Sequence, residues 1–127
     1  MIYLNRIEIM GFLGKDAETF VSQSSGKKVV KMSVATTRRG RKNENGETQN
    51  VTQWHSVEAW GSTAEIIDRM RVTKGTPVYV AGEIAYKKWT DKNGVNHVST
   101  SIVASSIQVL KVAPAQYPDD NEDYMPF

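Results

Sequence analysis

The 127-residue sequence contains no cysteine, which excludes a disulfide scaffold, thiolate chemistry and cysteine-ligated zinc. It has no apolar run near the ~20 residues of a membrane-spanning helix. The N-terminal segment lacks the basic start, apolar stretch and cleavage site of a signal peptide, so we expect a cytoplasmic protein that contacts no membrane. Hydrophobic residues still make up 39% of the chain, which is enough for the packed core of a single domain.

Residues typical of enzyme active sites are also scarce. The two histidines, His55 and His97, do not have the spacing of a metal-binding pair. There is no Gly-x-Ser-x-Gly elbow and no Gly-x-x-x-x-Gly-Lys phosphate loop. A small barrel enzyme such as a nuclease would need clustered carboxylates, and we interpret Glu58, Glu65 and Asp68 as ordinary surface acids. We therefore expect no catalytic residues, no cofactor and no metal.

The charges are divided unevenly along the chain. Residues 1–118 hold 16 Lys and Arg against 10 Asp and Glu, a net charge of +6, and residues 119–127 hold four acids and no base, a net charge of −4. This division is typical of a polyanion-binding body with an acidic tail. A solvated surface followed by a disordered end would give the same numbers, so the charge alone does not choose between these two interpretations.

Alternation of apolar and polar residues predicts five strands. They cover residues 2–13, the segment around 30–35, and residues 51–60, 78–89 and 95–110, the last with a break at Ser105-Ser106. Residues 38–50 are polar and indicate a loop or a hairpin tip, because Asn45-Gly46 is a strong tight-turn pair. We predict a second hairpin turn over 91–94, between the last two strands.

A short helix is predicted between the third and fourth strands. Ser62 and Glu65 have the spacing of a capping box, and the helix would turn Ala64, Ile67 and Met70 inward. Five strands with a helix at this place indicate an all-β, Greek-key barrel of the oligonucleotide/oligosaccharide-binding (OB) kind. An SH3-like barrel is the main alternative, but it lacks a capped helix there.

The regular pattern stops near Leu110. We therefore place the OB-fold domain at residues 1–110 and a short proline-containing linker at 111–118. The last segment, 119–127, is too acidic to fold alone, and we expect a disordered acidic tail.

Three tryptophans are predicted to lie outside the barrel core. Trp54 and Trp60 alternate with the apolar Val57 and Ala59, and Trp89 lies opposite the apolar face of the fourth strand. Exposed indoles can stack on nucleic-acid bases, each contributing ~1–3 kcal/mol whatever the sequence. Burial in a subunit interface is the other explanation for such rings, and both can hold.

Basic residues lie close to these tryptophans in the sequence. They are Arg38, Arg39, Arg41 and Lys42 in the polar segment after the second strand, and Lys87 and Lys88 just before Trp89. Cationic side chains neutralise phosphates and release condensed counterions. A charged loop alone is usually only solvated, but basic segments beside a face with exposed tryptophans indicate nucleic-acid binding.

Several segments resemble the bacterial single-stranded DNA-binding proteins of the general replication and repair type. They are residues 5–16, 34–36, 52–57, 75, 78–83 and 88–94, and the acidic end 119–127 that closes in Pro126-Phe127. The resemblance implies an OB barrel that assembles as a homotetramer and binds single-stranded DNA in replication, recombination and repair, with no enzymatic activity. It implies a cytoplasmic protein associated with the nucleoid. A primosome-type or RNA-binding OB module is the alternative, although such modules usually lack the tail.

The resemblance also implies roles for single residues. Trp54, Trp60 and Trp89 match base-stacking positions, Arg6 and Lys74 match basic positions near the DNA strand, and His55 matches a subunit-interface position. The tail matches a docking peptide for replication, recombination and repair proteins. Its partner-binding residues would be Asp119, Asp120, Glu122, Asp123, Met125, Pro126 and Phe127.

Two features depart from the family pattern. Family members often carry a further tryptophan after the second strand, where this chain has Gly40, so a stacking platform is expected to be missing. The linker is also short, and eight residues such as 111–118 reach at most ~28 Å when fully extended.

Overall fold

The computed structural model describes residues 1–111, so the predicted tail and all of the predicted linker except Lys111 lie outside the described residues. The elements are β1 (Ile7–Leu13), β2 (Glu18–Val21), β3 (Lys28–Lys42), β4 (Thr48–Trp60), α1 (Gly61–Met70), β5 (Pro77–Thr90) and β6 (Asn96–Val109). Within this part of the chain, no helix is both long enough and apolar enough to cross a membrane.

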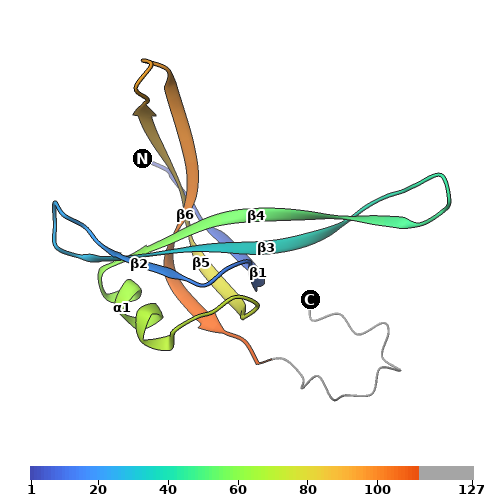
Figure 1. Cartoon of the computed structure of the whole chain (residues 1–127), viewed down its shortest axis with the longest axis horizontal. Helices are drawn as coiled ribbons and strands as arrows, with labels where there is room; N and C mark the ends of the chain where they lie inside the picture. The colour runs from blue at the N-terminus through green and yellow to red at the C-terminus, as the bar shows by residue number, and fades with distance from the viewer. Residues whose placement is uncertain (112–127) are drawn as a thin grey trace.

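Five strands close into a barrel (Figure 1). They pair in the order β1, β5, β6, β4 and β3, and β1 also pairs with β3. The β4–β6 pair is parallel, and the others are antiparallel. These findings confirm the all-β OB barrel with its short helix. The four-residue β2, which was not predicted, pairs with the first four residues of β3, Lys28 to Lys31.

The barrel interior is filled by aliphatic residues at alternate strand positions. Val30, Met32 and Val34 of β3 are buried there with Val57 and Ala59 of β4. Burial of each valine or methionine side chain contributes about 1.5–3 kcal/mol, so this alternation stabilises the barrel. It also fixes which face of β3 and β4 points outward, because neighbours along a strand point to opposite sides.

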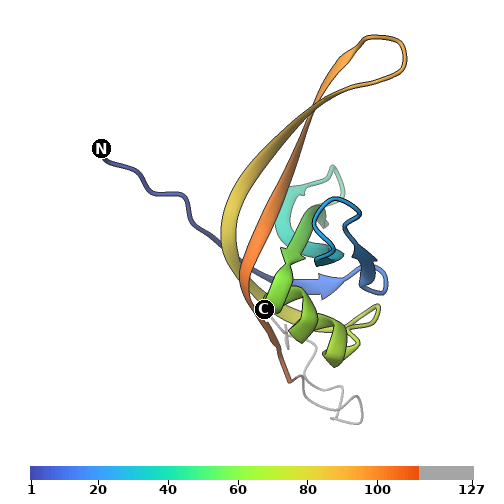
Figure 2. The ribbon, with the colours of Figure 1, turned by 90° about the vertical axis from the view of Figure 1, so that its left-hand side faces the viewer.

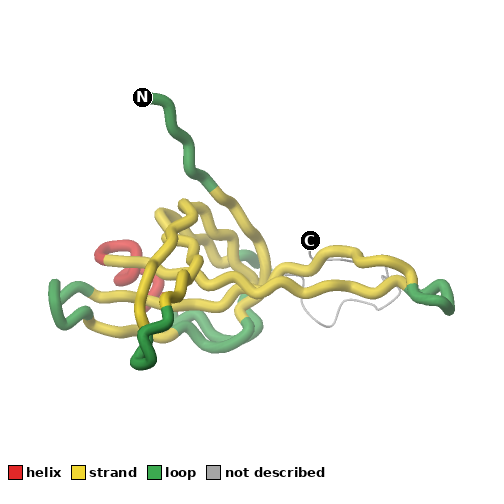
Figure 3. The backbone as a smooth tube through the Cα atoms, turned by 90° about the horizontal axis from the view of Figure 1, so that it is seen from above, coloured by secondary structure: helices red, strands yellow, loops and turns green. Residues whose placement is uncertain are grey.

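The helix covers the end of the barrel opposite the tip of the β3–β4 hairpin (Figure 3). Ala64 and Ile67 are buried as predicted, but Met70 is 39% exposed because the helix ends there and Arg71 turns the chain in a left-handed conformation. The predicted capping box is wrong. The helix begins at Gly61, its N-cap residue is Trp60, and no side chain caps it.

Two hairpins extend from the barrel (Figures 1 and 3). Residues 38–50, predicted as a loop or a hairpin tip, form the end of the β3–β4 hairpin and are mostly strand, because β3 runs to Lys42 and β4 begins at Thr48. Between them the side chain of Asn43 accepts hydrogen bonds from the backbone N–H groups of Asn45 and Glu47, at 2.9 Å each. The turn at Asn45-Gly46 is thus confirmed, but the basic residues before it lie on a β-ribbon rather than a loop.

The break predicted in the last strand is a β-bulge. Ala81 pairs with Ser106 and Gly82 pairs with Ala104, so Ser105 is an extra residue on β6. The strand therefore stays continuous from Asn96 to Val109 and bends around the barrel.

The predicted first strand is too long at its start. β1 begins at Ile7, and residues 1–4 are exposed and extend away from the barrel (Figure 2). Asn5 sits between these two parts, where its side chain donates to the carbonyl of Ile84 at 2.8 Å and accepts from the N–H of Ile84 at 3.0 Å. The Asn5 side chain thus makes with Ile84 the two hydrogen bonds that a paired backbone residue would make in a strand.

Candidate nucleic-acid interface

The outward sides of β2, β3 and β4 form a face that we call the platform face. Residues directly opposite each other in a sheet point to the same side, so the pairing register defines its rows. They are Phe20–Val29–Trp60, Glu18–Lys31–Glu58, Ser33–Ser56, Ala35–Trp54, Thr37–Thr52 and Arg39–Asn50. Trp54 and Trp60 therefore lie on one face, about 20 Å apart along β4.

Trp54 is 62% exposed and rests on a glycine. A Cβ atom added to Gly14 would lie 2.2 Å from Cζ3 of the indole, so only glycine allows the ring to lie there. The loop around Lys74 is bonded to the same segment, because the N–H of Lys74 donates to Asp16 Oδ1 at 2.7 Å and that of Gly75 donates to the carbonyl of Leu13 at 2.8 Å. Lys74 is exposed in this loop.

Trp60, at the other end of the platform face, is 44% exposed. It lines a hollow of about 200 Å³ together with Phe20, Ser22, Val29, Lys31, Glu58 and Lys87. Two predicted site residues, Trp60 and Lys87, thus come together from β4 and β5. Phe20 was missed because the short segment Glu18–Val21 has no apolar alternation to reveal a strand. Lys31 was missed because only the fold brings it beside Trp60 and Phe20.

Trp89 lies in the hairpin formed by β5 and β6. Its ring stacks on that of His97, with 4.3 Å between centroids and 19° between planes, and its Nε1–H donates to Ser99 Oγ at 3.0 Å. His97 Nε2 is in turn 2.8 Å from Asp91 Oδ2, and this hydrogen bond is the main cause that lowers the pKa of Asp91. These contacts hold the indole in one orientation and leave it 47% exposed.

The predicted basic residues are spread over several elements rather than forming one cluster. By register Arg39 lies on that face, whereas Arg38 pairs with Val51 and points to the other side of the ribbon. Arg41 and Lys42 are exposed near the tip of the β3–β4 hairpin, and Lys88 lies on β5 just before Trp89.

Arg6 lies apart from the platform face. It lines another hollow with Ala81 and Glu83, and its guanidinium is 3.5 Å from Glu8 Oε1. The pKa of Glu8 is lowered, first by the hydroxyl of Tyr79, which donates to it, and then by the charge of Arg6.

His55 is half-buried and hydrogen-bonded, with its Nε2 2.8 Å from Thr36 Oγ1. This contact agrees with a structural histidine at this position. No group of three His, Asp or Glu side chains within residues 1–111 could hold a metal ion.

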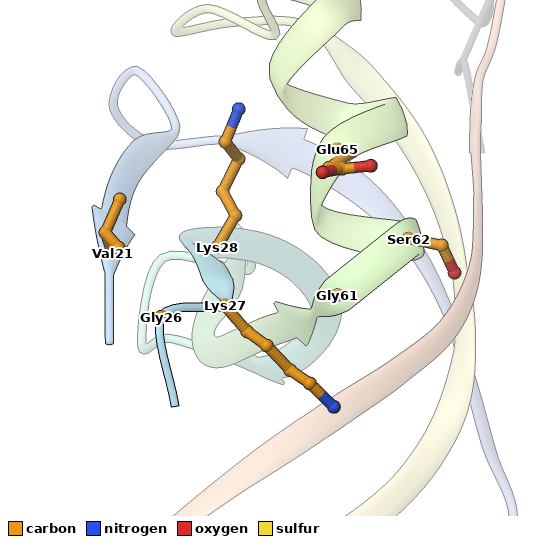
Figure 4. Close-up of a pocket in the computed structure, with 7 residues that line it drawn as sticks. All are labelled: Val21, Gly26, Lys27, Lys28, Gly61, Ser62 and Glu65. Carbon is orange, nitrogen blue, oxygen red and sulfur yellow. The ribbon is translucent and has the colours of Figure 1, made fainter. Parts of the chain in front are cut away.

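A further hollow separates the β2–β3 turn from the start of α1 (Figure 4). Lys27 and Lys28 line it from the sheet side, with their side chains pointing in opposite directions, and Glu65 lines it from the helix. Lys28 Nζ is 2.9 Å from Asp68 Oδ2, and Thr19 Oγ1 donates to Asp68 Oδ1 at 2.9 Å. Asp68 is therefore more than an ordinary surface acid, because it ties the helix to β2 and β3.

The closed barrel, its helix and the tryptophan-bearing face define the class as an OB-fold protein. The sequence profile of the single-strand binding protein family matches residues 4–110. The chain belongs to this family.

Two relatives support the assignment by sequence. The chain is 34% identical to single-stranded DNA-binding protein 1 of Xylella fastidiosa over the whole length of both proteins. It is 39% identical to the single-stranded DNA-binding protein of Xanthomonas axonopodis pv. citri, over 84% of this chain and 58% of that protein. The second relative thus has a large part that this chain does not match.

Solved structures support the fold. The Plasmodium falciparum SSB in complex with ssDNA is similar with a TM-score of 0.76 and 27% identity, over 87% of this chain and 98% of that one. A deletion mutant of the single-stranded DNA-binding protein from Thermus aquaticus has a TM-score of 0.70 over 85% of this chain and 51% of that one, and its 21% identity bears on the fold alone.

Proposed function

We propose that this chain binds single-stranded DNA without sequence preference and acts by binding rather than by catalysis. The observation that carries the proposal is the set of three half-exposed indoles, Trp54, Trp60 and Trp89, on a barrel of the single-strand binding protein family. Bases would stack on these rings, and nearby cations would neutralise the phosphates. The proposed cations are Arg6, Arg38, Arg39, Arg41, Lys42, Lys74, Lys87 and Lys88.

Stacking on open rings gives a physical reason for a preference for single strands. The bases of a duplex are already stacked on each other, so only an unpaired strand can offer its π-faces to the indoles. Binding to the open form would also melt hairpins, because a ligand shifts an equilibrium toward the state that it binds. Such a protein would coat exposed strands in replication, recombination and repair.

The test measures, by fluorescence anisotropy, the affinity of the protein for a labelled oligo(dT) and for a labelled duplex of the same length. We expect tight binding of the single strand and weak, strongly salt-dependent binding of the duplex. Equal affinity for the single strand and the duplex would mean that phosphate attraction alone explains the binding, and it would contradict the stacking proposal. An RNA oligonucleotide that competes better than DNA would instead favour an RNA-binding module.

We further infer that the OB domain ends near residue 110 and assembles as a homotetramer, with His55 at a subunit interface. Support comes from the family membership and from the half-buried position of His55. Light scattering at micromolar concentration is expected to give four chains per particle. A monomer would contradict this inference, and a dimer would favour a primosome-type protein.

The last part of the proposal concerns residues 119–127, in a cytoplasmic, nucleoid-associated protein. Phe127 would occupy an apolar pocket of a replication, recombination or repair protein. Met125 and Pro126 would pack beside it. The acids Asp119, Asp120, Glu122 and Asp123 would add attraction toward a basic rim, which salt weakens.

A further inference from the structure

Phe20 is an exposed aromatic ring on the platform face, on a strand that the three tryptophans do not occupy. It is 47% exposed, in a strand of only four residues. By register it lies opposite Val29, which in turn lies opposite Trp60. Two aromatic rings therefore flank a buried valine in one row across three strands.

The spacing of this row suits a flat ligand. Neighbouring strands lie about 4.7–4.9 Å apart, so the two rings stand about 10 Å apart across two strand spacings. Offset-stacked rings prefer centroids about 4.5–7 Å apart, which leaves room for one ring system between Phe20 and Trp60. The hollow here measures about 200 Å³, less than the ~300–1,000 Å³ of pockets that hold drug-sized ligands, and so fits a single base.

The charges around the hollow suit a nucleotide. The ammonium of Lys31 lies 5.7 Å from the centre of the Phe20 ring, a cation–π distance that holds the lysine beside the ring. Lys87 lines the same hollow from β5, so two cations border the space between the rings. Glu58 also lines it, but its Oε1 accepts a hydrogen bond from Ser101 at 3.2 Å.

We propose that Phe20 and Lys31 form a nucleobase-binding subsite on β2, so that bound single-stranded DNA extends over this edge strand. The inference rests on the proposed function and adds a position to it. One base stacks on Phe20 and faces Trp60, while Lys31 and Lys87 neutralise the adjoining phosphates. The subsite would supply a fourth aromatic platform in a chain that has Gly40 where relatives often have tryptophan.

The test uses the full chain and oligo(dT) titration at fixed salt. Phe20→Leu keeps the apolar bulk and removes the π-face, and we expect it to weaken binding by about 5- to 10-fold, the lower part of the range for one stacked base. Phe20→Trp keeps a ring and should bind as tightly as the unchanged protein. The matched control is Val21→Ala, the next residue on the same strand, 63% exposed and opposite Lys28 rather than Val29. We expect it to bind normally.

A direct contact is tested by photocrosslinking with a 5-iodouracil-substituted oligo(dT). Mass spectrometry should find a crosslink on the peptide that contains Phe20, and Phe20→Leu should lose it. Normal binding by Phe20→Leu, or the absence of this crosslink while Trp60 is crosslinked, would overturn the subsite. If Phe20→Leu does not fold, the subsite is tested by the affinity of Phe20→Trp and by the crosslink in the unchanged protein.

Two further outcomes are distinguishable. If Phe20→Leu changes the particle mass in light scattering but leaves affinity per chain unchanged, the ring is a subunit contact and the subsite is overturned. If the unchanged protein itself does not bind oligo(dT), the proposed function fails rather than this inference alone.

Discussion

At the scale of single residues, two of the exposed tryptophans are held in place by contacts with neighbouring residues. Gly14 makes room for Trp54, and His97 and Ser99 hold Trp89. Neither indole belongs to the hydrophobic core. We therefore predict that Trp54→Ala and Trp89→Ala each weaken single-strand binding by about 1–3 kcal/mol and leave the melting temperature nearly unchanged. Normal binding by both variants would refute the stacking role, and loss of the fold by either would place that ring in the core.

Gly40 shows why a missing tryptophan cannot simply be restored. A Cβ atom at this position would lie 2.2 Å from the carbonyl oxygen of Gln49 on the paired strand. We predict that Gly40→Trp distorts the β3–β4 hairpin and weakens DNA binding. Thr37→Trp is the control, because Thr37 is exposed and shares the platform face with Trp54. It should bind at least as tightly as the unchanged protein, and tighter binding by Gly40→Trp would contradict this account.

At the scale of elements, the β3–β4 ribbon separates its arginines. Arg39 lies on the platform face and Arg38 on the other side. Each phosphate contact on single-stranded DNA contributes about 0.7 to the slope of log affinity against log salt. We predict that Arg39→Gln lowers this slope by about that amount, that Arg38→Gln lowers it less, and that glutamine at Arg38, Arg39, Arg41 and Lys42 together flattens it most. An unchanged slope in the fourfold variant would show that the ribbon stays solvated on DNA.

The β5–β6 turn provides a pH test. The pKa of Asp91 lies below its ordinary value of 3.8, first because of the hydrogen bond with His97 and then because the N–H groups of Val95 and Asn93 donate to it. A lowered pKa means that the folded turn favours the carboxylate. This contribution is present above about pH 4 and is lost as the pH falls through the lowered pKa.

We therefore expect the turn to stay ordered between pH 7 and 5 and to loosen below about pH 4. Amide NMR shifts of Asn93 and Val95 would measure this change, and Asp91→Asn should loosen the turn already at neutral pH. A turn that keeps its amide shifts at pH 2 would argue against the role of Asp91.

The predictability of the elements follows from how much alternation each one shows. The buried valines of β3, β4 and β5 revealed those strands, since one face of each is apolar. β2 could not be predicted, because all four of its residues are exposed and only its pairing with β3 makes it a strand. For the same reason, the sequence of residues 38–50 left a loop and a hairpin tip as alternatives, since beyond Thr36 both faces of the β3–β4 ribbon are largely polar.

The candidate site was only partly predictable. The parity of β4 correctly placed Trp54 and Trp60 on the side away from Val57, because a strand has a fixed period of two. Lys87, Trp60 and Phe20 line one hollow. Their proximity depends on how β2 and β5 lie relative to β4 in the closed barrel. No local pattern carries that information, so Phe20 and Lys31 emerged only from the structure.

At the scale of the whole molecule, the charge is segregated between a +6 body and a −4 end. We predict that deleting residues 119–127 leaves DNA binding intact or slightly tighter, because a competing negative charge is removed. The same deletion should abolish binding to a replication or repair partner, measured by pull-down with purified proteins. Full-affinity partner binding by the truncated chain, or its loss of DNA binding, would contradict the proposed role of this segment.

The measurement that tests the central claim most directly is a titration of intrinsic tryptophan fluorescence with poly(dT) and, in parallel, with duplex DNA. Stacked bases quench indoles, so poly(dT) should quench the emission strongly and to saturation, and the Trp54→Ala and Trp89→Ala variants should each lose part of the change. Duplex DNA should cause little quenching. Binding of poly(dT) without quenching, or equal quenching by the duplex, would show that the exposed tryptophans of this barrel are not base-stacking platforms.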